Sequence, residues 1–102
     1  MSLSEAQRRA TKAELQEAFE RSGKTEDEAC AELGCSPAAL RCVMDLNADA
    51  LEDAWILRDY FADAAHGRGV EPVRFSALAG DPADYWFLDA DRIHRRDLAT
   101  RV

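Results

Sequence analysis

Apolar side chains recur every three or four positions along the first part of the chain, which is the spacing of helices that bury one face. The first such stretch follows Ser4, which has the S-x-x-Q spacing of a helix-capping box with Gln7, and it stops at Ser22 and Gly23. Its apolar positions are Ala6, Ala10, Ala13, Leu15, Ala18 and Phe19. We therefore predict a first helix between Ser4 and Gly23.

Two shorter helices are predicted to follow. Thr25 and Glu28 form a second capping box, and this helix should end at Gly34. Ser36 caps a third helix, whose first position is Pro37, where a missing amide hydrogen costs nothing. The third helix should end near residues 46–47.

A fourth and longer helix is predicted from Ala50 to about His66. Its apolar residues cover more than one face of the helix, as a helix at the centre of a fold or at an interface requires. These residues are Leu51, Ala54, Trp55, Ile56, Leu57, Tyr60, Phe61 and Ala64. We expect this helix to be central or to make an interface.

The pattern after Gly69 allows two structures. Residues 73–77 alternate apolar and polar as a short strand would, and residues 85–88 could pair with them as a β-hairpin. Asp81 and Pro82, however, are equally typical of a helix start. Beyond them, Asp89 or Asp91 should open a final helical turn. The fold class is therefore mainly α, a helix-turn-helix bundle of four to five helices with the C-terminal hairpin left open.

The length of 102 residues suits one core, so we expect a single domain over residues 1–102. Its helix-turn-helix portion spans about residues 4–47, and its aromatic-rich portion about residues 50–102.

Residues 25–43 have the residue types that a helix-turn-helix needs. Cys30 is small enough for close helix crossing, Gly34 suits the turn, and Leu40 and Val43 would hold the last helix to the core. This spacing resembles the helix-turn-helix of phage-repressor-like regulators. An ordinary helical hairpin is the alternative.

A wider resemblance covers residues 51–60, 71–78 and 85–89, which look like blocks of an uncharacterised bacterial family, domain of unknown function 2316. The resemblance implies a compact bacterial protein with a helix-turn-helix-like N-terminal region. It implies no activity, ligand or catalytic residue.

Charge weakens the expectation of DNA binding, because the chain has 13 basic and 20 acidic residues, which gives a net charge of −7. Arg41 and Ala38 would face the bases, with Arg41 as the one strong base-reading side chain. The phosphate contacts would come from Arg8, Arg9 and Lys12. We predict a small DNA-binding transcriptional regulator; the alternative is a non-catalytic protein–protein interaction module that keeps the helix-turn-helix without binding DNA.

The aromatic residues are concentrated in the second half of the chain, where they can fill the core or form a twofold interface. The interface candidates are Trp55, Tyr60, Phe61 and Trp86. We expect a homodimer, and a different protein partner is left open.

Other chemistry has little support in the sequence. The three cysteines, Cys30, Cys35 and Cys42, could hold a metal with a histidine such as His66 or sense oxidants, but burial in the core is the simpler interpretation. No phosphate-binding loop or metalloprotease motif occurs. We therefore expect no metal, no cofactor and no enzymatic activity. With no apolar run of roughly 18 residues and no signal-peptide pattern, we expect a cytoplasmic protein that does not enter membranes.

Overall fold

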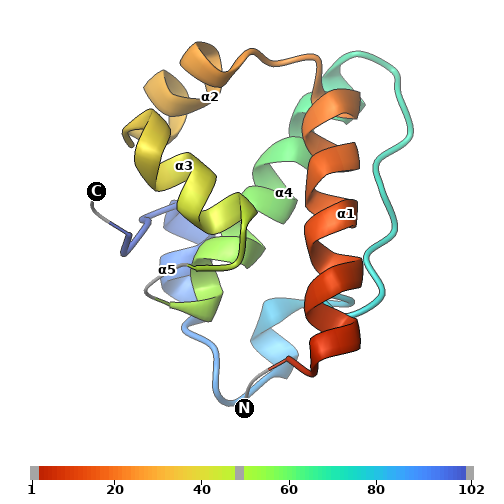
Figure 1. Ribbon diagram of the computed structural model, residues 1–102, viewed down its shortest axis with the longest axis vertical. Helices are drawn as coiled ribbons and strands as arrows, with labels where there is room; N and C mark the ends of the chain where they lie inside the picture. Colours follow the sequence, from red (N-terminus) through yellow and green to blue (C-terminus); the bar gives the residue numbers. More distant parts are fainter. Residues whose placement is uncertain (1–2, 48–49, 101–102) are drawn as a thin grey trace.

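The computed structural model describes residues 3–47 and 50–100, and these are mainly helical as predicted (Figure 1). The elements are α1 (Glu5–Ser22), α2 (Glu26–Leu33), α3 (Pro37–Met44), α4 (Leu51–Gly67), the 3-10 turn η1 (Pro82–Asp84) and α5 (Ala90–Arg95). The described residues contain no β-strand.

The first three helices begin where their capping residues predict. The side chains of Ser4, Thr25 and Ser36 each accept a hydrogen bond from the backbone N–H three residues later. At Ser4 and Thr25 the capping box is reciprocal, as expected. The third helix ends at Met44, slightly earlier than predicted, and Leu46 then adopts a left-handed φ of 59° that turns the chain away.

The centre of the molecule is α4, which passes between α1 on one side and α3 and α5 on the other (Figure 1). Its buried residues are Asp53, Ala54, Trp55, Ile56, Leu57, Tyr60, Phe61 and Ala65. The prediction of a central helix is confirmed. One connected cluster of buried apolar residues draws on all five α-helices.

The buried face of α1 differs from the apolar positions that the sequence indicated. Leu15 and Ala18 are buried as expected, but Thr11 and Ser22 fill the other inner positions. The hydroxyl of Ser22 donates to the backbone carbonyl of Phe19 at 2.5 Å. The packing of α1 against α4, and not the polarity of each side chain, therefore decides which small residues face inward.

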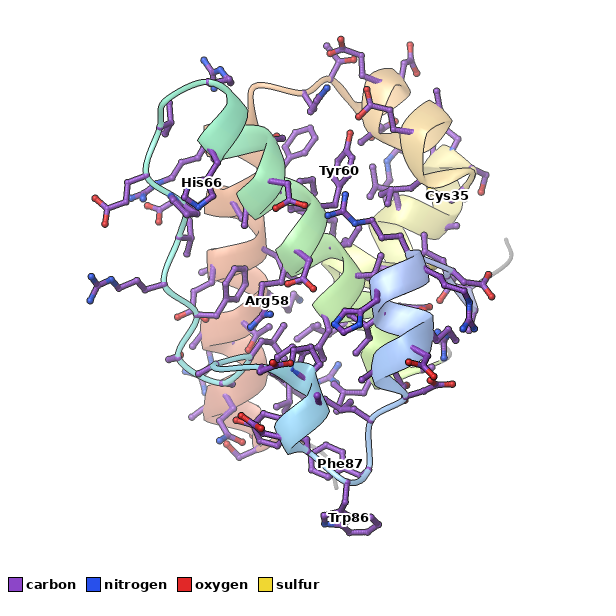
Figure 2. The ribbon with its side chains drawn as sticks, turned by 180° about the vertical axis from the view of Figure 1, so that it is seen from behind. Cys35, Arg58, Tyr60, His66, Trp86 and Phe87 are labelled. Carbon is purple, nitrogen blue, oxygen red and sulfur yellow. The ribbon has the colours of Figure 1, made fainter. Side chains whose placement is uncertain are left out.

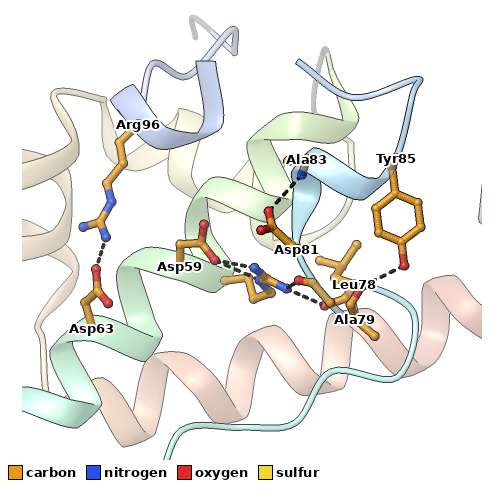
Figure 3. A network of polar contacts seen from close by, with 10 residues as sticks. Asp59, Asp63, Leu78, Ala79, Asp81, Ala83, Tyr85 and Arg96 are labelled. Atoms are coloured by element: carbon orange, nitrogen blue, oxygen red, sulfur yellow. Dashed lines mark hydrogen bonds and ion pairs between the residues drawn. The ribbon is translucent and has the colours of Figure 1, made fainter. Parts of the chain in front are cut away.

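For the segment between α4 and α5, the sequence allowed either a β-hairpin or a helix start at Asp81 and Pro82. It is a loop with one 3-10 turn, in which Asp81 caps Pro82–Asp84 by accepting from the N–H of Ala83 at 2.9 Å (Figure 3). Arg58 of α4 donates to the carbonyls of Leu78 at 3.1 Å and Gly80 at 2.7 Å. A hairpin does not form here: the N–H of Ser76 donates to the carboxylate of Glu14 in α1, and the N–H groups of Tyr85 and Leu88 donate to carbonyls three residues earlier in the chain.

Candidate functional site

The pair α2 and α3 lies where the helix-turn-helix was predicted. Gly34 ends α2 with a left-handed φ of 69°, and the N–H of Cys35 donates to the carbonyl of Cys30 at 3.0 Å. The inner face of α3 is buried through Ala39, Leu40 and Val43. This packing leaves the opposite face of α3 open to solvent.

Two of the predicted DNA-contact residues lie on this open face of α3. Ala38 is exposed, and the Arg41 side chain is 69% exposed. The Arg41 guanidinium is already engaged, because its Nη2 lies 3.0 Å from Oε1 of Glu26 in the first turn of α2. Arg41 also lines a groove of about 400 Å³, together with Phe19 and Met44. Arg41, the candidate for reading a base, is thus ion-paired with Glu26.

The other three DNA-contact candidates stand on the first turns of α1. Arg8, Arg9 and Lys12 are all exposed. The Nη2 atom of Arg8 donates to the carbonyl of Leu46 at 3.1 Å, which places this residue beside the end of α3. Of the three basic residues, Arg8 is therefore the one that directly contacts the segment after α3.

Three of the four interface candidates are not on the surface. Trp55, Tyr60 and Phe61 are 2%, 5% and 0% exposed, so their prediction as interface residues is wrong for the folded chain and the core alternative holds. They are buried because α4 is covered by other helices on several sides. Trp86 alone remains, 90% exposed, projecting from the loop before α5 with its ring 5.8 Å from that of Phe87 (Figure 2).

A polar pair joins α4 to α2. The hydroxyl of Tyr60 donates to Oε1 of Glu32 at 2.5 Å, and Nζ of Lys24 lies 3.0 Å from the other carboxylate oxygen. The Tyr60 hydrogen bond, followed by that of Lys24, lowers the pKa of Glu32. Burial, together with the Glu32 contact, raises the pKa of Tyr60. The pair ties two helices together.

The sequence interpretation missed a buried carboxylate at Asp53, which is fully inaccessible. It accepts hydrogen bonds from Nη2 of Arg92 at 2.5 Å, from the N–H of Ala99 at 2.9 Å, and from both the N–H and the hydroxyl of Thr100 at 2.9 and 2.6 Å. An acidic residue in an apolar helix, together with arginines near the C-terminus, was the available signal. Arg92 is thus paired inside the molecule, and Arg96 pairs with Asp63, another acidic residue of α4, nearer the surface (Figure 3).

The cysteines are free thiols: Cys30 is buried, while Cys35 and Cys42 are half-buried. Residues 3–47 and 50–100 contain no group of three or more histidine, cysteine or acidic side chains placed to hold a metal ion. Within the same residues, no helix is both long enough and apolar enough to cross a membrane.

Comparison with known proteins gives one family match. A family model described as an uncharacterized protein conserved in bacteria (DUF2316) matches residues 1–89. The match includes all of α1 to α4 and η1, whereas α5 follows it. No curated protein and no solved structure matches the chain.

Proposed function

We propose that this chain, which belongs to the bacterial family DUF2316, is a small DNA-binding transcriptional regulator in which α2, the turn and α3 act as a helix-turn-helix. In such motifs the second helix enters the major groove and its exposed side chains meet the bases. The observation that carries the proposal is the open face of α3. It presents Ala38 and Arg41 to solvent while the other face is held in the core.

The basic residues of α1 support the same orientation. Contact between Arg8 and the carbonyl of Leu46 sets the start of α1 beside the end of α3. Arg9 and Lys12 are exposed on the same turns of α1 and would contact phosphates, while Arg41 would read a guanine through a bidentate hydrogen bond.

Glu26 would oppose this function in the free protein. Its carboxylate neutralises Arg41, so DNA must replace an existing ion pair before the guanidinium reaches a base. The net charge of −7 adds a general repulsion from phosphate. We therefore expect weak binding that is strongly reduced by salt.

Selection of binding sites from random DNA at low salt, followed by affinity measurements at rising salt, tests this function. A selected site should emerge, and the Arg41→Ala variant should bind it less tightly, by about 1–3 kcal/mol, with relaxed specificity at one position. Glu26→Gln should bind more tightly than the unaltered chain, because it frees Arg41. Lys12→Ala should weaken all sequences equally and lower the salt slope by about one unit.

Arg74→Ala is the matched control, since Arg74 is an exposed arginine in the loop after α4. It removes the same charge from the protein and should leave the affinity for the selected site nearly unchanged. If no site emerges, or if Arg74→Ala weakens binding as much as Arg41→Ala does, the regulator proposal fails.

The second candidate is a non-catalytic protein–protein interaction module that keeps the helix-turn-helix without binding DNA. The observation that favours it is Trp86, because tryptophan is enriched at the centres of interfaces and this one is 90% exposed. A homodimer formed through this residue should appear in sedimentation of the unaltered chain and dissociate in Trp86→Ala. Sedimentation as a monomer by both proteins would leave the homodimer without support.

A further inference from the structure

Two cysteines, Cys30 and Cys35, flank the turn between α2 and α3 and line the same pocket. The N–H groups of Gly34 and Cys35 both donate to the carbonyl of Cys30, which is the hydrogen-bonding arrangement that ends a helix through a left-handed glycine. In that arrangement the side chains on the two sides of the turn contact each other. Here they are Cys30 and Cys35.

The thiol pair is accessible from one side. Cys30 is only 7% exposed and is anchored in the core, whereas Cys35 is half-buried. Both line an open pocket of about 420 Å³, together with small residues of α2 and α3 and the hydroxyl-bearing Ser36 and Thr100. Figure 2 shows Cys35 at the edge of the molecule. An ion can therefore reach the two sulfurs without the core opening.

Burial, followed by the proximity of Cys30, raises the pKa of Cys35 to about 11. A cation that binds between the two sulfurs must therefore displace their protons. A cation held between the sulfurs would neutralise two thiolates that otherwise repel each other, and so it would offset the cost of removing their protons.

We propose that Cys30 and Cys35 form a two-coordinate site for a soft monovalent cation, Cu(I). Thiolate sulfur is the ligand that such ions prefer. Binding replaces two S–H bonds by two S–Cu bonds and releases two protons to solvent, and no electron is transferred. Structural zinc sites need four ligands, and the described residues place no third histidine, cysteine or carboxylate with these thiols. A site with only two ligands therefore suits Cu(I) better than Zn²⁺.

Titration of the full-length, reduced chain with Cu(I) under argon, against a coloured Cu(I) chelator, tests the site. We expect one Cu(I) per chain and two protons released at neutral pH. Cys35→Ala and Cys30→Ala should each lose this one-to-one complex. Cys42→Ala should keep it, because Cys42 is a half-buried thiol of α3 that does not line the pocket. Zn²⁺ added in equal amount should not displace Cu(I).

Circular dichroism checks that the variants fold. If Cys30→Ala unfolds, Cys35→Ala carries the test, because Cys35 lies at the surface end of the pair. Retention of one Cu(I) by folded Cys35→Ala would overturn the proposal. So would equal loss in Cys42→Ala, or displacement of Cu(I) by Zn²⁺. The experiment does not involve DNA, and its result is independent of the regulator proposal.

Discussion

Asp53 carries a carboxylate into the centre of the molecule, and its surroundings explain why an acidic residue is stable there. A guanidinium, two backbone N–H groups and a hydroxyl occupy its two oxygens. Buried charges are tolerated when they are paired and fully hydrogen-bonded. Asp63 also pairs with an arginine, but its side chain is 67% exposed. The two residues share an arginine as partner, but Asp53 is buried and has three further donors, whereas Asp63 lies at the surface.

We expect Asp53→Asn to lower the free energy of unfolding by about 3 kcal/mol, because an amide cannot accept all these hydrogen bonds and leaves Arg92 less well paired. Asp63→Asn is the matched control and should cost less than about 1 kcal/mol, as exposed ion pairs do. Urea denaturation of the three proteins measures both values. Equal losses would mean that Asp53 does not anchor the C-terminal segment.

The pair formed by Tyr60 and Glu32 predicts a pH dependence. Because the folded state lowers the pKa of Glu32, the stabilisation is fully present above its usual value of 4.5 and is lost as the pH falls through the lowered value. The difference in unfolding free energy between the unaltered chain and Tyr60→Phe should therefore be largest near neutral pH and shrink in acid. Urea denaturation at several pH values measures it.

Tyr85→Phe is the control for this measurement. The Tyr85 hydroxyl donates to the carbonyl of Ala79 at 2.8 Å, and a carbonyl does not titrate. Its effect on stability should be the same at neutral and acid pH. A Tyr60→Phe difference that is equally independent of pH would show that the hydrogen bond does not depend on the charge of Glu32.

At the scale of the elements, helix ends follow local rules. The capping side chains of α1, α2 and α3 and the glycines after α1 and α2 act within a few residues, so the boundaries can be read from short patterns. Both Gly23 and Gly34 have a left-handed φ, of 70° and 69°. Their surroundings differ, because a Cβ at Gly23 would lie 2.6 Å from the Arg68 guanidinium, while nothing lies within 4 Å at Gly34.

Replacing these two glycines by alanine separates backbone strain from crowding. Gly34→Ala should cost about 1 kcal/mol of stability, from the left-handed conformation alone. Gly23→Ala should cost more, since Arg68 must also move and loses its 2.8 Å hydrogen bond to the carbonyl of Arg21. Thermal denaturation ranks the two variants. A larger loss for Gly34→Ala would contradict this ordering.

At the scale of the whole molecule, the position of α4 determines which aromatic residues are available. Trp55 is covered by other parts of the chain, with its ring 5.4 Å from that of Tyr85 and the Arg58 guanidinium 4.5 Å above it. Trp86 has no comparable cover. Trp55 therefore packs in the core, whereas Trp86 lies on the surface.

Trp55→Ala should lower the free energy of unfolding by about 3–5 kcal/mol, as truncation of a buried aromatic side chain does. Trp86→Ala should change it by less than about 0.5 kcal/mol, because exposed positions contribute little. Urea denaturation at low protein concentration, where self-association is minimal, compares them. A large loss in Trp86→Ala under these conditions would show that the residue stabilises the chain itself.

Much of the candidate site could be predicted, because α3 presents Arg41 and Ala38 to solvent by simple helical periodicity. The pairing of Arg41 with Glu26 could not be predicted, since it joins residues 15 positions apart on two helices. The same holds for Asp53, whose partners lie 39 to 47 positions away. No local pattern indicates which carboxylate will be buried.

The sequence by itself determined the helices, their caps and the open face of α3, because capping, glycine turns and helical periodicity act over a few residues. Only the tertiary structure decided that α4 is covered on several sides, that the loop before α5 is not a hairpin, and that Trp86 rather than Trp55 faces solvent. It also placed polar Thr11 and Asp53 inside. The physical reason is that burial and pairing depend on contacts between distant segments, which form only when the helices pack.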